Sequence, residues 1–306
     1  MIWIPIVAGA IVILLFAVIY YFFRIAFVRT KDRPYLDEKP KSKEHEHFYN
    51  LIDEGSEWYE SAPKEDVYIE SYDGLRLHGE IIRASEETNR TIILFHGYRS
   101  IAKKDFSCAI PYYHSLGLNI ILIDQRAHGK SEGKLITYGV KERYDACSWV
   151  ELAKEKFPGS KIYLSGISMG SSTVMMASDI LKGVSGIVAD CGFTSPKEII
   201  QLVAKKEYKL PKWCCAPVGL FARIFGGFDY SYSAERSLAK TNIPILFIHG
   251  KADDFVPCYM TDKNFEACAS DKRKIIVENA THGFSFLFAP KEVKDGIERF
   301  ILKNEE

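Results

Sequence analysis

The hydrophobic pattern divides the chain into one long apolar run and a series of short ones. Residues 1–23 carry no charged side chain. From Asp66 onward, apolar and polar positions first alternate on either side of Tyr72-Asp73-Gly74, which is typical of a β-hairpin. Strands buried on both faces of a sheet are almost continuously apolar, and such strands are predicted next. They are expected at residues 91–95, 119–124, 161–165, 186–190, 245–249 and 274–277.

Helix-length segments separate most of these short apolar runs. They cover residues 103–116, 140–156, 168–182, 259–269 and 290–302. Alternation of strands and helices predicts an α/β fold: a doubly wound, mostly parallel sheet with helices on both faces. The opening hairpin is expected to add an antiparallel edge to this sheet.

A long interval between the fourth and fifth of the short apolar runs interrupts the alternation. It is rich in proline and aromatic side chains, and we expect a short helical cap insertion at about residues 193–240. In such a sheet, an insertion after a central strand lies over the carboxyl ends of the strands. Its aromatic residues predict either an apolar pocket wall or a small core within the cap. These are Trp213, Phe221, Phe225, Phe228, Tyr230 and Tyr232.

The first apolar run is long enough to cross a bilayer. As a helix, residues 1–23 would extend roughly 33 Å. The alternatives are a buried core helix and a cleaved signal peptide. The signal peptide is disfavoured, because no basic residue precedes the run and no small-residue cleavage site follows it. We therefore predict a single-pass transmembrane anchor at residues 1–28. Basic residues follow the run and none precedes it, which predicts that the main domain lies on the cytoplasmic side.

Residues 29–65 are highly charged and are predicted to be a tether between the anchor and the main domain at 66–306. Apolar residues recur at helical spacing within the tether, and they predict a short amphipathic helix. This helix either packs on the main domain or lies on the membrane surface, and its many acidic neighbours favour packing on the domain. The recurring residues are Phe48, Leu51, Ile52, Trp58 and Tyr59.

Charge and cysteine content exclude several classes of function. The chain has 40 basic and 40 acidic side chains, so no positive excess is present to bind nucleic acid. Its 7 cysteines are odd in number and contain no CxxC pair, which argues against a disulfide framework or a zinc site. The sequence makes no prediction about the oligomeric state.

A serine between two glycines is the first candidate for chemistry. Gly166-Ile167-Ser168-Met169-Gly170 follows a predicted strand and opens a predicted helix, which is the setting of the G-x-S-x-G nucleophile motif. Side chains at the two glycine positions would collide with the neighbouring strand and helix. The helix N-terminus also favours negative charge that develops during a reaction.

A serine nucleophile needs a base and an acid elsewhere in the chain. In the chain order Ser, Asp, His, the base is His282, which follows the last apolar run. Three aspartates lie after strands between the serine and this histidine: Asp190, Asp253 and Asp254. The residues by themselves leave the choice among these carboxylates open.

Two backbone N–H groups are needed to stabilise an oxyanion. One candidate donor is Met169, which follows the nucleophile. The other lies in the loop after the strand at residues 91–95, where we expect Tyr98 to supply it. The preceding glycine, Gly97, permits a tight approach of the backbone.

Five motifs, in order, resemble those of the α/β-hydrolase superfamily, in particular the membrane-anchored single-domain serine hydrolases of the BEM46-like and serine-aminopeptidase-like groups. The resemblance covers about Asp66 to Leu302. It implies that Asp253 is the catalytic acid, and that the loop containing His128 is structural, although Ala127 stands where glycine is usual. The motifs are HGYR (96–99), DQRAHGKSEG (124–133), GISMGS (166–171), HGKADDFVP (249–257) and THGF (281–284).

The function that follows from the resemblance is a serine hydrolase that cleaves carboxylic esters. Its expected catalytic residues are Ser168, Asp253 and His282, with Tyr98 and Met169 as oxyanion donors. No metal or organic cofactor is expected, and the expected partners are a small or lipid-like acyl substrate and the membrane. The alternatives are a thioesterase or peptidase of the same fold, or an inactive membrane-tethered binding protein.

Overall fold

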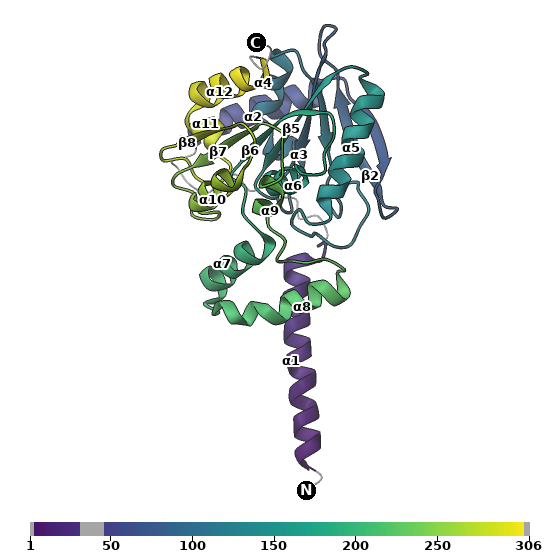
Figure 1. The fold of residues 1–306 in the computed structure, drawn as a ribbon, viewed down its shortest axis with the longest axis vertical. Helices are drawn as coiled ribbons and strands as arrows, with labels where there is room; N and C mark the ends of the chain where they lie inside the picture. Colours follow the sequence, from purple (N-terminus) through teal and green to yellow (C-terminus); the bar gives the residue numbers. More distant parts are fainter. Residues whose placement is uncertain (1–2, 31–45, 303–306) are drawn as a thin grey trace.

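The computed structural model describes residues 3–30 and 46–302 of the chain. A single eight-stranded sheet runs through the main domain, with the strand order β1-β2-β4-β3-β5-β6-β7-β8 (Figure 1). The strands are β1 (Glu65–Glu70), β2 (Arg76–Ile82), β3 (Arg90–Phe95), β4 (Asn119–Ile123), β5 (Lys161–Ile167), β6 (Val184–Asp190), β7 (Ile245–Gly250) and β8 (Lys272–Val277).

The direction of the strands confirms the predicted sheet. Strands β1 and β2 form an antiparallel hairpin, and β2 pairs antiparallel with β4. The strands from β4 across to β8 run parallel to one another. Every residue of β4 and of β7 is buried, which explains why these strands appear in the sequence as uninterrupted apolar runs.

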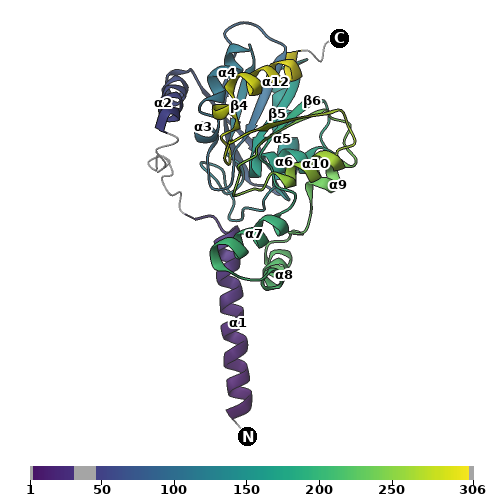
Figure 2. The same cartoon turned by 90° about the vertical axis from the view of Figure 1, so that its left-hand side faces the viewer.

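Helices cover both faces of the sheet and create two hydrophobic cores (Figures 1 and 2). The core on one face is built with α5 (Glu142–Lys156), α6 (Met169–Ala177), α9 (Ala234–Leu238) and α10 (Tyr259–Ala267). The core on the other face is built with α2 (Glu46–Ser61), α3 (Ala102–Asp105), α4 (Ala109–Ser115), α11 (Ser285–Phe288) and α12 (Pro290–Leu302).

The segment at residues 103–116 is not one continuous helix. It forms α3 and α4, which are separated at Phe106, Ser107 and Cys108. Pro111 lies in the first turn of α4, where a missing N–H costs little. A continuous helix would place the same proline in its interior, where it would remove a backbone hydrogen bond.

The amphipathic helix in the charged segment packs against the main domain. Helix α2 contacts α3 and α4, and its apolar residues Phe48 and Tyr59 are buried. The hydroxyl of Tyr59 donates a hydrogen bond to Glu80 on β2. Figure 2 shows α2 on the flank of the domain, away from the projecting part of α1.

The interval after β6 forms a small cap beside the long N-terminal helix. The cap consists of α7 (Pro196–Tyr208), the short helix η2 (Lys212–Cys215) and α8 (Ala216–Phe225). Of its aromatic residues, Phe221, Phe228 and Tyr230 are buried, whereas Trp213 and Phe225 are exposed. The buried members therefore belong to the same hydrophobic core as α6, rather than to a separate core of the cap, and the exposed members form an apolar surface.

Helix α1 (Trp3–Phe27) projects from the domain, yet its C-terminal end belongs to the hydrophobic core (Figure 1). Phe23 is 3% exposed and Phe27 is 0% exposed. Just beyond the helix, the Arg29 guanidinium donates hydrogen bonds of 2.6 and 2.7 Å to the carbonyls of Gly129 and Ser131. The main domain thus includes residues that precede the charged segment, and the end of α1 is fixed to it.

Candidate active site

Ser168 lies in a sharp turn between β5 and α6. Its backbone has φ 55° and ψ −114°, a conformation that costs on the order of 1–3 kcal/mol for a residue with a side chain. A Cβ on Gly166 would overlap the backbone of Gly170, and a Cβ on Gly170 would overlap the carbonyl of Phe95 on β3. The two glycines therefore allow β5, α6 and β3 to approach closely enough to hold the turn.

Because of this close approach, Gly170→Ala is expected to destabilise the domain. The added methyl group must push α6 away from β3, and overpacking of this kind costs about 3 kcal/mol. The measurement is the thermal unfolding midpoint of the full-length chain. Gly9→Ala is the matched control, because a Cβ at this helical glycine would meet nothing within 4 Å. Equal midpoints for the two variants would contradict the steric argument.

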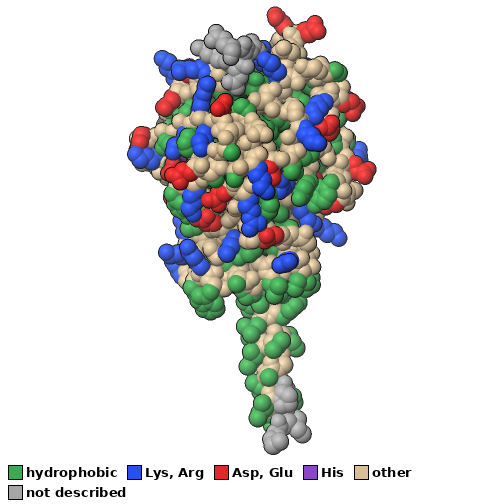
Figure 3. Space-filling view, in the orientation of Figure 1, with side chains coloured by type: hydrophobic (Ala, Val, Ile, Leu, Met, Phe, Trp, Pro, Cys, Tyr) green, Lys and Arg blue, Asp and Glu red, His purple; other side chains and the backbone are tan. Residues whose placement is uncertain are grey.

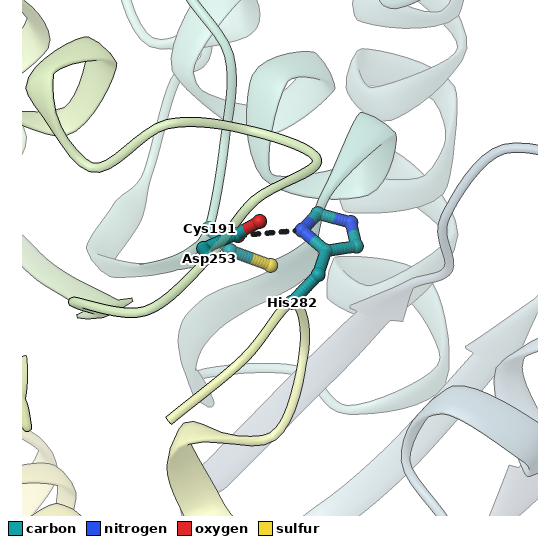
Figure 4. A group of neighbouring side chains, drawn as sticks. All are labelled: Cys191, Asp253 and His282. Carbon is teal, nitrogen blue, oxygen red and sulfur yellow. Dashed lines mark hydrogen bonds and ion pairs between the residues drawn. The ribbon is translucent and has the colours of Figure 1, made fainter. Parts of the chain in front are cut away.

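The turn brings Ser168 to His282, and His282 to Asp253. The Nε2 atom of His282 lies 2.9 Å from the Oγ atom of Ser168, and its Nδ1 atom lies 2.7 Å from Oδ2 of Asp253. Figure 4 shows the Asp253 carboxylate directed at the nearer nitrogen of the imidazole. In this arrangement, Nδ1–H donates to the carboxylate and leaves Nε2 free to accept the serine proton.

The other two aspartates make different contacts. Asp254 is directed to the surface, where its side chain is 80% exposed and pairs with Lys206 at 2.9 Å. Asp190 is buried, and it accepts a hydrogen bond of 3.2 Å from the Ser285 hydroxyl. Among the three aspartates, Asp253 is therefore the one whose carboxylate hydrogen-bonds to His282.

Several donors hold Asp253 in its ionised form. Its Oδ1 atom accepts hydrogen bonds of 2.9 Å from the N–H groups of Phe255 and Val256. The Nε2 atom of His249 lies 3.2 Å from Oδ2. Burial by itself would raise the pKa of Asp253, but the hydrogen bonds from His249 and His282 outweigh burial and hold this pKa well below its usual value. His249 has no distinguishing signal in the sequence beyond its place at a strand end.

The pKa of Asp190 is shifted in the opposite direction from that of Asp253. Burial raises its pKa to about 6, although His249 and the Ser285 hydroxyl favour the ionised form. Between the pKa of an unfolded aspartate, about 4, and the raised pKa of Asp190, the folded state keeps a proton that the unfolded state has released. The free energy of unfolding therefore falls as the pH rises through this interval. The stability contribution of the neutral carboxyl is therefore lost between about pH 4 and pH 6.

The Asp190→Asn variant should reveal this loss. Its free energy of unfolding, relative to the wild type, is expected to increase by about 1 kcal/mol from about pH 5 to pH 7.5. The measurement is denaturant unfolding at both pH values. Asp254→Asn is the control, since Asp254 is exposed and should show the same difference at both pH values. A pH-independent effect of Asp190→Asn would show that Asp190 does not titrate in this range.

The two predicted oxyanion donors flank the serine. Helix α6 begins at Met169, so the N–H group of Met169 is among the first amides of the helix, which have no partner within it. The loop with Tyr98 passes close to Ser168, because a Cβ on Gly97 would lie 3.5 Å from Cβ of Ser168. The Gly97 N–H donates to Asp105 at 2.6 Å, which fixes the path of this loop.

Two buried histidines support the same loop. The Nε2 atom of His128 accepts a hydrogen bond of 2.9 Å from the Arg99 N–H, and its Nδ1 atom lies 2.9 Å from the Arg126 carbonyl. His96 bridges the Gly97 carbonyl and the Gln125 N–H in the same way. Burial, followed by the proximity of His96, lowers the pKa of His128 to about 3. His128 therefore remains neutral, and it connects the backbone of the Tyr98 loop at Arg99 to the backbone of the loop after β4 at Arg126.

The loop is also attached to the end of the N-terminal helix. The Tyr98 hydroxyl donates to the Ala26 carbonyl at 2.8 Å, and the Arg99 guanidinium donates to the Ile25 carbonyl at 2.7 Å. The Tyr138 hydroxyl donates to the same Ala26 carbonyl at 3.1 Å, and the Tyr98 and Tyr138 rings stack at 4.9 Å. No pattern in the sequence indicates this contact, which connects the long helix to the loop over Ser168.

Cys191 lies beside the Asp253–His282 pair (Figure 4). The sulfur, a carboxylate oxygen and a ring nitrogen are within 4.8 Å of one another, and these atom types can bind zinc. However, burial raises the pKa of the Cys191 thiol well above its ordinary value. The 2.7 Å between Nδ1 and Oδ2 also suits a hydrogen bond, whereas ligand atoms around a tetrahedral zinc lie roughly 3.3 Å apart. The group thus fits a hydrogen-bonded pair better than a zinc site.

Comparison with known proteins places this chain in a family. A family model described as "alpha/beta hydrolase fold" matches residues 90–231. The uncharacterized protein YqkD of Bacillus subtilis is 31% identical over 238 residues, which are 75% of this chain and 76% of that protein. The bem46 protein of Schizosaccharomyces pombe is 25% identical over 219 residues, which are 70% of this chain and 66% of that protein.

The solved structures include a similar molecule, the esterase Pf2001 of Pyrococcus furiosus. One crystal form has a TM-score of 0.69 and 23% identity, and it covers 90% of this chain and 98% of the esterase. Another has a TM-score of 0.65 and 25% identity, and it covers 84% of this chain and 95% of the esterase. With its eight-stranded sheet, its serine turn and these relatives, the chain belongs to the α/β-hydrolase family.

Proposed function

We propose that the chain is a serine hydrolase that cleaves carboxylic esters with Ser168, His282 and Asp253. The observation that carries this proposal is the continuous series of hydrogen bonds from the Ser168 hydroxyl, through both nitrogens of His282, to the Asp253 carboxylate. A serine, a base and an orienting carboxylate in this arrangement are the parts needed for nucleophilic catalysis of acyl transfer.

The reaction would proceed through an acyl-enzyme. The Oγ atom of Ser168 attacks the carbonyl carbon of the ester, and its proton passes to Nε2 of His282. The tetrahedral intermediate collapses when His282 gives this proton to the leaving alcohol, and the C–O bond to the alcohol breaks. Water then loses a proton to His282 and attacks the acyl carbonyl, which releases the acid and restores the serine hydroxyl.

Asp253 and the backbone amides would stabilise the charges that arise. Asp253 is ionised and keeps the His282 proton on Nδ1, so it stabilises the imidazolium after the serine proton is transferred. The N–H groups of Met169 and Tyr98 are the proposed donors to the oxyanion. Met169 also lies at the N-terminus of α6, whose dipole favours negative charge at this position.

An ester is the proposed substrate class, with thioesters and peptide amides as the alternatives. The similarity to an esterase supports this choice, and the apolar cap beside α1 supports a lipid-like acyl group. The experiment is a panel of p-nitrophenyl esters from short to long acyl chains, together with the thioester and the anilide of the best acyl group. Highest kcat/KM for the ester supports the proposal, and a preference for the thioester or amide would reassign the substrate class.

Labelling with a fluorophosphonate separates an enzyme from an inactive binding protein. This probe reacts with a serine that is activated by a base, so the wild-type chain is expected to be labelled. If the chain were neither labelled nor active on any member of the panel, the hydrolase proposal would be wrong. The chain would then be a binding protein on the same fold.

We also propose that α1 anchors the protein in a membrane with the catalytic domain on the cytoplasmic side. Residues 6–27 are long and apolar enough to cross a bilayer, and a signal sequence near an N-terminus would share these properties. Removal of α1 as a signal sequence would delete Phe23 and Phe27 from the hydrophobic core, which supports an uncleaved helix. The basic residues after the apolar run support the cytoplasmic orientation.

The mass of the mature protein and its resistance to alkaline extraction test the anchor. An intact N-terminus in the membrane fraction supports it, and a mature chain that begins after α1 would exclude it. A reporter fused at Glu306 tests the orientation, since a reporter active only outside the cytoplasm would reverse it.

A further inference from the structure

The cap presents an apolar surface where a water-soluble domain usually presents a polar one. We define the cap apolar face by Trp213, Leu220, Ile224 and Phe225, which are 76%, 56%, 62% and 56% exposed. The opposite side of α8 is also apolar, because Val218, Phe221 and Ala222 are buried in the core. Arg223 is the one charged residue of α8, and an exposed apolar surface of this kind typically marks a site that protein or lipid covers.

The cap apolar face is continuous with the surface of α1. The Phe16 ring lies 5.0 Å from the Phe221 ring and 6.4 Å from the Phe225 ring. The Phe22 ring lies 5.5 Å from the ring of Tyr208 at the end of α7. Figure 3 shows hydrophobic side chains continuing from α1 onto the adjoining end of the domain, with Lys and Arg side chains beyond them.

The length of α1 places α8 at the level of a membrane interface. The part of α1 that precedes the buried end extends from Trp3 to Tyr21, or about 28 Å, and the hydrocarbon of a bilayer is about 30 Å thick. Phe16, which contacts α8, lies five residues before Tyr21, or about 8 Å along the axis. Interfacial helices bury their apolar face to a depth of about 5–10 Å. If α1 spans the bilayer, α8 therefore lies within its interfacial layer.

The charges around the cap suit an anionic lipid surface. Residues 196–225 contain six basic and two acidic side chains. Three of the basic residues, Lys197, Lys212 and Arg223, line a groove of about 530 Å³ between α7 and α8. Trp213 and Leu220 of the cap apolar face line the same groove. Its acidic lining residue, Asp229, pairs with Arg236 at 3.8 Å. Basic groups beside an apolar surface match a phosphate headgroup above its acyl chains.

We propose that η2 and α8 dock into the interface of the anionic bilayer that α1 spans. The apolar residues lie among the upper acyl chains, and the three basic residues contact lipid headgroups. Tyr98 and Arg99, which follow β3, bond to the last carbonyls of α1, so the carboxyl ends of the strands face the same membrane. The Ser168 site is then directed to the bilayer. The docking depends on the proposed anchor and is independent of catalytic activity.

Tryptophan fluorescence of the full-length chain in vesicles tests the docking. The vesicles contain phosphatidylserine and phosphatidylcholine with brominated acyl chains, which quench tryptophans that contact them. The contribution of Trp213 is obtained by subtracting the signal of Trp213→Phe from that of the wild type. Bromination is expected to reduce this contribution roughly twofold or more, because the apolar face of an interfacial helix reaches the acyl region that carries the bromine atoms. Trp58→Phe is the matched control, because Trp58 belongs to α2, which lies on the flank of the domain away from the projecting part of α1.

Two results would overturn the proposal. One is a Trp213 contribution that is quenched no more than the Trp58 contribution. The other is a chemically cross-linked dimer that is lost in the Leu220→Asp, Ile224→Asp double variant, which would assign the cap apolar face to a second copy of the chain. Vesicles of phosphatidylcholine alone test the charge contribution, and equal quenching in them would exclude a role for Lys197, Lys212 and Arg223.

Discussion

Ser168→Ala is expected to reduce kcat for the best p-nitrophenyl ester by about 10⁵-fold or more. The substitution removes the Oγ atom that is proposed to attack the carbonyl, and no other hydroxyl hydrogen-bonds to His282 Nε2 in the described part of the chain. Fluorophosphonate labelling should be lost together with hydrolysis. The two readouts are independent, because labelling does not require turnover of a substrate.

Ser171→Ala is the matched control for this variant. Ser171 lies three residues after Ser168, within α6, is buried, and has no hydrogen-bond partner for its hydroxyl among the described residues. Its replacement by alanine should leave labelling and kcat close to the wild-type values. Labelling that persists in Ser168→Ala and disappears in Ser171→Ala would transfer the nucleophile to the other serine.

Asp253→Asn is expected to lower kcat by about 10⁴-fold while the protein remains folded. An asparagine amide can donate to Nδ1 of His282, which places the imidazole proton on Nε2. His282 in this tautomer cannot accept the Ser168 proton, so the nucleophile is not activated. The measurement is kcat at neutral pH, with circular dichroism to confirm that the variant retains its fold.

The neighbouring carboxylates provide the controls for this second variant. Asp254→Asn changes an exposed side chain that pairs with Lys206, and it should retain nearly the wild-type rate. Asp190→Asn changes a buried carboxyl that bonds to Ser285 and not to His282, so its loss of kcat should be much smaller than that of Asp253→Asn. A larger loss for Asp190→Asn or Asp254→Asn would identify a different catalytic acid.

The sheet could be predicted from the sequence because its inner strands are buried on both faces. The run at residues 245–249 is apolar up to His249, so it lacks the alternating polar face of an amphipathic helix, and it corresponds to β7 at Ile245–Gly250. The break between α3 and α4 was not predicted. The break places Pro111 in the first turn of α4, where proline is tolerated. The start of α4 has no side-chain cap, so no capping residue marks this start in the sequence.

The candidate site could be predicted in part. The serine turn has a local signature, because the two small residues at 166 and 170 are required by the contacts of that turn itself. The choice among Asp190, Asp253 and Asp254 stayed open from the residues alone, because all three follow strands. The resemblance indicated Asp253, and the structure shows that its carboxylate receives two backbone N–H groups and the imidazole.

The sequence by itself determined the order of strands and helices, the small residues of the serine turn and the apolar length of α1, since each depends on neighbours along the chain. Tertiary structure alone decided that Ser168 hydrogen-bonds to His282, 114 residues away in the chain. It also decided that Phe27 is buried in the core while Phe16 is exposed, and that the end of α1 hydrogen-bonds to Tyr98. These contacts depend on how distant segments pair across the sheet. Within a continuous apolar helix, the sequence does not distinguish a residue that packs against protein from one that faces lipid, because both are apolar.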